Sequence, residues 1–360
     1  MTTTTQPATP PATEPHPDSQ TTDLTVGVFN IERFGFDSGR GNHRLRGALD
    51  FLLATTPTPP DVLALPEANN GLADQQRAIR EDTAYYLSLH LAEGWYEPLF
   101  ASQTLPGRKN SLHLLLVNTA RVRPKAWADP AAPLDPGRRH YGWARCEIVG
   151  HEVDLCCEHW SGGEGREVFD QAANRVANKG GLKRKTLLLG DFNADSGWDR
   201  ELHRTNRLNW YHQCRSQDNL DKLLQKGWFD PEGTNPVTGE PGWEYPWDRS
   251  GRRGWWTIDT RQLDKLRTIF GYIDMGEEAN SPTPTTNPRI GSGLRIDRIF
   301  RSRGFPATAI DYAVAQPPRV LSDHAYVFGT YRLCHASADT VDTGLSTVAV
   351  GGVTQPALTG

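Results

Sequence analysis

Short apolar runs alternate with segments of helical periodicity along most of the chain. Apolar runs and alternating apolar positions predict strands at residues 24–31, 61–66, 112–118, 142–149, 152–158, 187–189, 294–301, 307–315 and 325–333. Apolar residues at helical spacing predict helices at residues 43–53, 73–92 and 166–178. Strands interleaved with helices in this way favour an α/β architecture in which helices cover the sheets.

The rhythm stops at residues 198–293, which form a long insertion rich in Trp, Gly, Pro and Arg. Two short helical patterns lie within it, at residues 218–225 and 261–270. Structureless loops of such length are uncommon in compact domains. We therefore expect the insertion to pack on the core or to contact a substrate.

Both ends of the chain are poor in large apolar residues. Residues 1–22 are almost entirely Thr, Pro, Ala and Gln, and residues 335–360 are small and polar with scattered Val and Leu. Such segments bury too little surface to offset the entropy lost on ordering, so we expect a disordered N-terminal tail and a loose C-terminal tail. One domain is predicted between them, at residues 23–334.

Charge is balanced within this domain. The tails carry four acidic residues and no Lys or Arg, which leaves 39 acidic and 39 basic side chains between them. A protein that grips long nucleic acid without sequence preference usually shows a basic excess. Here the basic residues form only local clusters, which are typical of a solvated surface.

The sequence also suggests a cellular compartment. No apolar stretch approaches the ~20 residues that span a bilayer, and the N-terminus lacks the basic start and apolar run of a secretory signal. The five cysteines are odd in number and have no zinc-type spacing. Reduced thiols in a cytoplasmic protein are the simplest interpretation. Neither a membrane nor an obligate protein partner is indicated.

The segment Thr186-Leu-Leu-Leu-Gly-Asp-Phe-Asn-Ala-Asp195 joins a buried strand to polar chemistry. Asp191 and Asn193 follow the leucines two residues apart, and residues i and i+2 of an extended segment point to the same side. A carboxylate for a hard cation and an amide donor for a phosphate oxygen would then project together. Most Asp-x-Asn triplets are only turn caps, so this one needs support from elsewhere in the chain.

That support comes from the other predicted strand ends, where polar residues recur. They are Asn30, Glu67, His159, Asp297, and Asp323 with His324. A turn cap, a helix start or a satisfied core histidine would account for any one of them alone. Because strands of layered α/β folds place their terminal residues around a common crevice, the whole series favours a single site.

These residues stand in motifs that resemble the endonuclease/exonuclease/phosphatase family, its DNase I branch most closely. The motifs are Phe-Asn-Ile-x-x-Phe-Gly from residue 29, Gly-Asp-Phe-Asn-Ala-Asp from residue 190, Ile-Asp-Arg-Ile from residue 296 and Ser-Asp-His from residue 322. The family includes DNase I-type nucleases, abasic-site endonucleases, sphingomyelinases and inositol-polyphosphate phosphatases. The resemblance covers residues 24–333 and implies a four-layer α/β/β/α sandwich of two mixed sheets flanked by helices.

The resemblance also implies roles for the residues. Magnesium, with manganese as a possible substitute, would be bound by Glu67, Asn30 and Asp323. Asn193 would hold a phosphate oxygen, and Asp191 would lie near the attacking water. His324 would contact the scissile phosphate, with Asp297 fixing its tautomer and favouring its charged form. His159 matches a second histidine of the nuclease branch. The proton acceptor stays open among three candidates: His324, His159 and Asp191.

Two positions depart from the family pattern. Pro66 stands before Glu67 where most relatives have Gln, and proline fixes φ and removes an N–H. Leu294 and Arg295 occupy the place where abasic-site enzymes often carry an aromatic residue. The second departure disfavours a role in abasic-site repair.

Tryptophans and arginines of the insertion give the best clue to the substrate. The cluster is Trp243, Trp247, Arg249, Arg252, Arg253, Trp255 and Trp256. Interleaved aromatic and basic residues can stack bases and bind phosphates, although the rings would equally serve as a small core for the loop. Arg108 and Lys109 are further candidate phosphate contacts.

The leading hypothesis is a magnesium-dependent, DNase I-like phosphodiesterase acting on nucleic acid. A phosphatase or phospholipase-type hydrolase of a small phosphoester or lipid headgroup is the alternative, because the domain carries no net charge. A non-catalytic binding module is disfavoured, because every polar position of the motifs is present.

Overall fold

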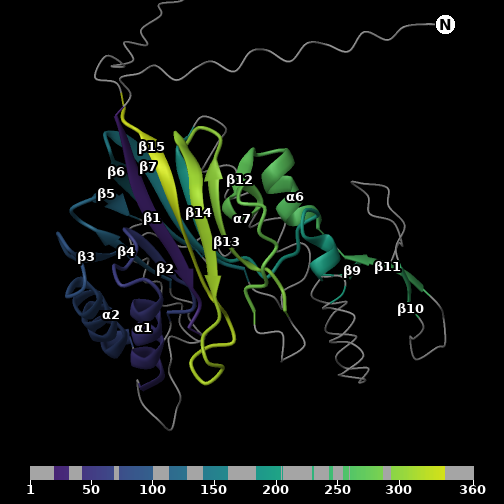
Figure 1. The fold of residues 1–360 in the computed structure, drawn as a ribbon, viewed down its shortest axis with the longest axis horizontal. Coiled ribbons are helices and arrows are strands. Elements are labelled where there is room, and N and C mark those ends of the chain that lie inside the picture. Colours follow the sequence, from purple (N-terminus) through teal and green to yellow (C-terminus); the bar gives the residue numbers. More distant parts are fainter. Residues whose placement is uncertain are drawn as a thin grey trace, which may run out of the picture.

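A computed structural model describes residues 20–31, 43–68, 73–99, 113–127, 141–160, 184–203, 205, 229–230, 243–245, 254–258, 260–286 and 293–336 (Figure 1). Two six-stranded sheets form the body of the molecule, and a three-stranded sheet belongs to the insertion. Among the described residues, no helix is long and apolar enough to cross a membrane.

The first sheet has the strand order β14-β15-β1-β2-β4-β3. Its strands are β1 (Thr21–Phe29), β2 (Val62–Leu65), β3 (Tyr96–Leu99), β4 (Leu114–Asn118), β14 (Ala307–Ala315) and β15 (Tyr326–Cys334). The pair β1 and β2 is parallel and the other pairs are antiparallel, so the sheet is mixed. This arrangement brings the ends of β1 and β2, which precede Asn30 and Glu67, to one edge.

The second sheet has the strand order β12-β13-β8-β7-β6-β5. Its strands are β5 (Val122–Trp127), β6 (Tyr141–Ile148), β7 (His151–His159), β8 (Thr186–Asp191), β12 (Tyr272–Asp274) and β13 (Asp297–Ser302). Only β7 and β8 are parallel within it. The third sheet contains β9 (Phe229–Asp230), β10 (Trp243–Tyr245) and β11 (Gly254–Ile258).

The three leucines of β8 show how the layers are built. Leu187 and Leu189 face the core between the two large sheets, whereas Leu188 faces the opposite side with Phe300 and Leu263. A strand that is covered on both faces has a continuous run of apolar residues and not an alternation of apolar and polar residues. Cys156 and Cys157 likewise face opposite sides of β7, and both are free thiols.

Helices cover the outer faces of the sheets, with α1 and α2 on one side and α6 on the other (Figure 1), whereas Met275 of the short helix α7 packs in the core between the sheets. These helices span α1 (His43–Thr55), α2 (Ala73–Ser88), α6 (Arg261–Thr268) and α7 (Met275–Glu278). Leu49 and Leu52 of α1 pack with Leu63 and Leu116 on the first sheet. The predicted four-layer sandwich is therefore confirmed.

The predicted elements differ from the structure mainly in short strands. β3, β5 and β12 were absent from the sequence prediction; β3 and β12 have four and three residues, and β5 carries Arg, Pro and Lys among its six. β1 begins at Thr21 and so includes two residues of the predicted tail. The predicted helix at residues 261–270 is present as α6, whereas those at 166–178 and 218–225 lie outside the described residues.

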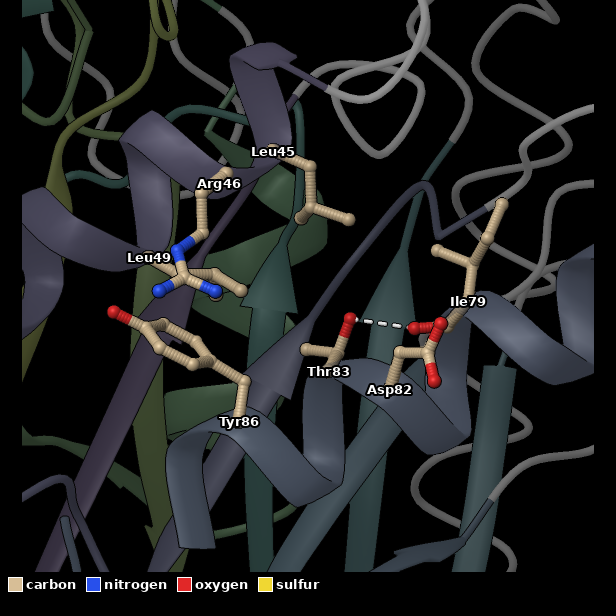
Figure 2. A pocket seen from close by; sticks show the side chains of 7 residues that line it. All are labelled: Leu45, Arg46, Leu49, Ile79, Asp82, Thr83 and Tyr86. Atoms are coloured by element: carbon tan, nitrogen blue, oxygen red, sulfur yellow. Dashed lines mark hydrogen bonds between the residues drawn. The ribbon is translucent and has the colours of Figure 1, made fainter. Parts of the chain in front are cut away.

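A pocket of about 170 Å³ lies between α1 and α2 (Figure 2). The Arg46 guanidinium carbon lies 3.4 Å from the centre of the Tyr86 ring, and the Thr83 hydroxyl donates to the Ile79 carbonyl oxygen. None of the residues that line this pocket is one of the predicted site residues.

Candidate active site

Asp191 lies at the centre of the predicted residues because three strands end beside it. In the sheet register, Asp191 of β8 pairs with His159 of β7 on one side and with Asp297 of β13 on the other. Gly190 makes this approach possible, since a Cβ atom there would lie 1.9 Å from the Glu158 carbonyl oxygen. Its φ of 153° is also one that L side chains rarely adopt.

The carboxylate of Asp191 is almost fully buried and accepts hydrogen bonds on both oxygens. Its Oδ1 accepts from the Asn193 backbone N–H at 2.9 Å, and its Oδ2 accepts from Asn30 Nδ2 at 3.1 Å. Burial raises the pKa of Asp191 to about 6; the charges of His324 and His159 oppose this shift, and the charges of Asp297 and Glu67 reinforce it. This carboxyl can therefore exchange a proton near neutral pH.

Asn193 reaches the site through a turn and not along an extended strand. β8 ends at Asp191, and Asn193 has a φ of 46°, in the left-handed region that Asn tolerates better than most residues. Its backbone N–H caps the Asp191 carboxylate in an Asx-type turn. Its amide Nδ2 donates to the Trp160 carbonyl oxygen at 2.8 Å and lies 3.4 Å from His159 Nε2. Asp191 and Asn193 do lie side by side, but the turn brings them together and not the alternation of an extended strand, so the predicted geometry was wrong.

His324 is held by Asp297. The His324 Nδ1 lies 2.9 Å and 3.1 Å from the two carboxylate oxygens of Asp297, which is fully buried. Its Nε2 faces Asp191, 3.9 Å from Oδ2. Burial lowers the pKa of His324, but the charge and hydrogen bond of Asp297, with the charges of Asp191 and Asp323, raise it well above its ordinary value. These contacts therefore favour the charged form of the imidazole.

Hydrogen bonds between hydroxyl side chains and the backbone hold the segments that carry Asp297 and His324. The Ser322 hydroxyl donates to the Asn30 carbonyl oxygen at 2.7 Å and accepts from the His324 backbone N–H at 3.0 Å. The Thr285 hydroxyl accepts from the Asp297 backbone N–H at 3.0 Å. The Ser-Asp-His motif contains Ser322, but no role was predicted for it, and nothing local in the sequence distinguishes Thr285.

His159 is held differently, by Glu67. Its Nε2 lies 2.9 Å from Glu67 Oε1 and 3.7 Å from Asp191 Oδ2. Burial lowers the pKa of His159, but the hydrogen bond with Glu67 and the charge of Asp191 raise it above its ordinary value. Glu67 itself has a φ of 54°, so the backbone turns sharply after Pro66.

His113 is a buried residue that the sequence analysis did not select. It directly precedes β4, and its ring centre lies 6.1 Å from that of His159 at an interplanar angle of 75°. The sequence feature that could have identified His113 is its position at the start of the apolar run Leu114–Asn118.

Within the part of the chain that the structure describes, two sets of side chains could hold a metal ion. In one, ligand atoms of Glu67, His159 and Asp191 all lie within 4.8 Å of one another; the other contains Asp191, Asp297 and His324. The first fits a divalent ion better, because two carboxylates and the neighbouring Asn30 amide supply hard donors, whereas Asp297 is already engaged by His324.

Two predicted groups stand apart from these sets. Asp323 belongs to neither, although its Oδ1 is buried and has no hydrogen-bond partner among the described residues. Arg108 and Lys109 lie outside the described residues. The structure thus brings together six of the predicted side chains around Asp191, namely Asn30, Glu67, His159, Asn193, Asp297 and His324.

Comparison with known proteins agrees with this arrangement. A family model described as "Endonuclease/Exonuclease/phosphatase family" matches residues 27–324. The chain belongs to this family. Its members are generally hydrolytic nucleases and phosphodiesterases, and they typically use a divalent metal. A search of curated proteins finds no significant match.

Solved structures share the fold at low sequence identity. A family protein from Bacteroides thetaiotaomicron is 15% identical with a TM-score of 0.51, and the match covers 89% of this chain and 99% of that one. An AP endonuclease from Archaeoglobus fulgidus is 14% identical with a TM-score of 0.48, covering 87% and 100%. TDP2 from D. rerio, solved with a single-strand DNA product, is 15% identical with a TM-score of 0.48, covering 86% and 99%.

Proposed function

We propose that the protein is a Mg²⁺-dependent phosphodiesterase that cleaves nucleic acid by attack of water on a phosphodiester. The observation that carries this proposal is the pairing of Asp191, whose pKa is about 6, with the charged His324 held by Asp297. A proton acceptor and a cationic donor face each other across the site, as general acid–base chemistry on a phosphoester requires.

Asp191 is the best proton acceptor of the three candidates. The pKa of His324 is raised well above its ordinary value, which favours the charged form, and a charged imidazole cannot accept a proton. His159 has no hydrogen-bond partner on Nδ1 among the described residues, so no carboxylate fixes its tautomer as Asp297 fixes that of His324. Asp191 is largely ionised at pH 7, and a pKa close to the working pH suits a general base.

The remaining side chains would bind the phosphate. His324 Nε2–H would donate to a phosphate oxygen and stabilise charge that develops in the transition state. Asn193, whose amide donates to the Trp160 carbonyl oxygen at the edge of the site, would bind another phosphate oxygen through that amide.

A divalent ion would be held by Glu67 and Asn30 beside Asp191, with Asp323 as a further proposed ligand. When bound, the ion would neutralise phosphate oxygens and the leaving oxygen. Oxygen donors of this kind suit Mg²⁺ and also accept Mn²⁺.

Nucleic acid is proposed as the substrate because of the insertion. The register of β10 and β11 places Trp243 opposite Trp256 in a small antiparallel sheet, next to the Glu244–Trp255 pair. Aromatic residues grouped on a short ribbon are a common platform for stacking bases. The neutral charge of the domain supports the rival substrate class, a small phosphoester or lipid headgroup.

A substrate panel with Mg²⁺, Mn²⁺, Ca²⁺ or a chelator tests the proposal. Nicking of supercoiled plasmid is expected with Mg²⁺ and Mn²⁺, and not in chelator, Asp191→Asn or His324→Gln. Glu152→Gln is the matched control, since this exposed carboxylate lies near the far end of β7. Hydrolysis of bis-p-nitrophenyl phosphate or a phosphoinositide without nicking would favour the rival class. No hydrolysis of any phosphoester by folded protein would contradict both.

A further inference from the structure

Six buried ionisable side chains form a cluster behind the candidate active site. We call it the charge cluster; it contains Asp195, Asp199, His203, Asp274, Arg295 and Arg298. Each is at most 3% exposed. No role was assigned to any of them from the sequence, although Asp195 ends the Gly-Asp-Phe-Asn-Ala-Asp motif and Arg295 stands at one departure from the family pattern.

Two carboxylates are shared by two arginines at the middle of the cluster. Arg295 Nη1 donates to Asp199 Oδ2 at 3.0 Å and to Asp274 Oδ2 at 2.9 Å, and its Nη2 bonds Asp274 Oδ1. Arg298 donates to Asp274 Oδ2 at 2.8 Å and to Asp199 Oδ2 at 2.9 Å. Such planar, forked contacts fix orientation more strictly than a point charge can.

His203 links this centre to the turn that follows β8. Its Nδ1 lies 2.6 Å from Asp195 Oδ1 and its Nε2 lies 3.2 Å from Asp199 Oδ1. Burial lowers the pKa of His203, but the charges of Asp195 and Asp199 raise it above its ordinary value. With His203 protonated, the cluster contains three cations and three anions and is electrically balanced.

The cluster adjoins two of the segments that carry the candidate site residues. Asp195 is two residues from Asn193, and Arg295 and Arg298 stand on either side of Asp297. Arg298 is also the register partner of Gly190, next to Asp191. Because Ile299 faces the core between the sheets and Phe300 faces the outer layer, Asp297 and Arg298 point to opposite faces of β13.

Stability alone is a weak explanation for such a cluster. Replacing buried ion pairs by apolar side chains is often neutral or stabilising, because desolvation offsets the attraction between the charges. What charged groups add is a defined geometry, and here the geometry joins two strand ends to the first turn of the insertion.

We propose that the charge cluster sets the position of the Asp297–His324 pair relative to Asp191 and Asn193. Arg295, Arg298 and His203 are then positioning residues for the hydrolytic reaction, an assignment that rests on the proposed function. On this account, the start of the insertion is part of the scaffold of the active site.

Three changes disturb the cluster in different ways. Arg298→Lys keeps the positive charge but removes the guanidinium group that bonds two carboxylates at once. His203→Gln removes one cation. Gly276→Ala alters no charge, yet its Cβ would lie 2.0 Å from Arg295 Nη2 and displace that side chain. Each is expected to lower kcat by about 10- to 100-fold with little change in KM, the scale of effect that a misplacement near 1 Å can produce.

A rescue and a control separate positioning from general destabilisation. Asp195→Asn combined with His203→Gln restores charge balance and allows an amide–amide hydrogen bond, so its kcat should exceed that of His203→Gln. Arg301→Gln is the control, because it removes a forked pair with Glu278 (3.0 and 2.5 Å) from the same strand, away from the cluster. Its kcat should stay at the wild-type value.

All assays are run on protein shown to be folded by circular dichroism, well below its melting temperature. Wild-type kcat in folded Arg298→Lys and Gly276→Ala would overturn the proposal. A crystal structure of Gly276→Ala gives a readout that needs no activity: the separation of Asp191 Oδ2 and His324 Nε2, here 3.9 Å, should change. An unchanged separation would also overturn it. If the wild-type protein cleaves no phosphoester, the proposed function fails. The positioning role is then tested only by the distance between Asp191 Oδ2 and His324 Nε2 in the Gly276→Ala crystal structure.

Discussion

The two histidines beside Asp191 differ in what holds them. His324 is fixed on Nδ1 by Asp297, a fully buried carboxylate of β13, so its Nε2 is directed at Asp191. His159 meets Glu67 through Nε2, the nitrogen that faces the site, and its Nδ1 has no hydrogen-bond partner among the described residues. Asp297 thus binds His324 and is not a proposed metal ligand, whereas Glu67 binds His159 and is also a proposed metal ligand.

This difference suggests that the two histidines have unequal tasks. The carboxylate that holds His324 is Asp297, which is not among the proposed metal ligands. The contact of His159 depends on Glu67, which can accept either the histidine or a metal ion. Substitutions should therefore have a larger effect at His324 than at His159.

Loss of the His324–Asp297 pair should have the largest effect. His324→Gln removes the cationic donor, and Asp297→Asn removes the carboxylate that holds it. We expect each to lower kcat by about 10³-fold, within the usual range for a general acid–base group. Steady-state kinetics at saturating Mg²⁺ measure this, and a loss below tenfold in both variants would show that His324 is not central.

Substitution at His159 should have a smaller effect. His159→Gln keeps a polar group near Asn193 and Glu67 and leaves Asp297 and His324 in place, so we expect kcat to fall by about 10²-fold. The same assay compares it directly with His324→Gln. An equal or larger loss would reverse the ranking of the two histidines.

The stability of the metal-free protein should fall as the pH rises above neutrality. His324 has a raised pKa in the folded state, so its contribution is fully present below the unfolded value of about 6.5 and is lost as the pH passes through the folded value. The shifts of His159 and His203 act in the same direction. Each unit of pKa difference corresponds to about 1.4 kcal/mol of unfolding free energy.

Urea unfolding between pH 6 and pH 9 in chelator measures this dependence. His324→Gln should have a shallower fall than the wild-type protein. An equal slope in the two proteins would show that His324 does not bind its proton more tightly in the folded state.

The smallest effect is expected at His113, whose ring packs against the ring of His159. His113→Leu keeps an apolar volume and loses the edge-to-face contact, a contact worth about 1 kcal/mol. We expect a change of a few-fold in kcat and none in the Mg²⁺ requirement. A loss as large as that of His159→Gln would assign His113 a direct part in the reaction.

Local patterns in the sequence predicted the α/β class and most of the strands, and the family resemblance predicted the four-layer sandwich. The leucines of β8 predicted a buried strand, which the structure covers on both faces. Polar residues at strand ends predicted a common crevice, and Asn30, Asp191 and His159 do lie together. The strand β5 was missed because its Arg, Pro and Lys hide the alternation.

The features that could not be predicted depend on contacts between distant residues. The left-handed backbone of Asn193 depends on the Asx-type turn, which spacing alone does not reveal. Arg295 was noted only as a departure from the family pattern, because its partners Asp199 and Asp274 lie far away in the sequence. Asp323 follows its motif but stands outside both candidate metal sets.

Metal binding to the wild-type protein and to Glu67→Gln tests the central claim most directly. Isothermal titration calorimetry with Mg²⁺ and Mn²⁺ gives the affinity, and repetition in buffers of different ionisation enthalpy gives the protons released. We expect one divalent ion to bind the wild-type protein and to release a proton near neutral pH, because His159 loses its Glu67 partner. Glu67→Gln should bind more weakly by on the order of 10- to 100-fold or more, with less proton release. Equal binding to the two proteins, or none to the wild-type protein, would contradict a metal-dependent phosphodiesterase built around Glu67 and Asp191.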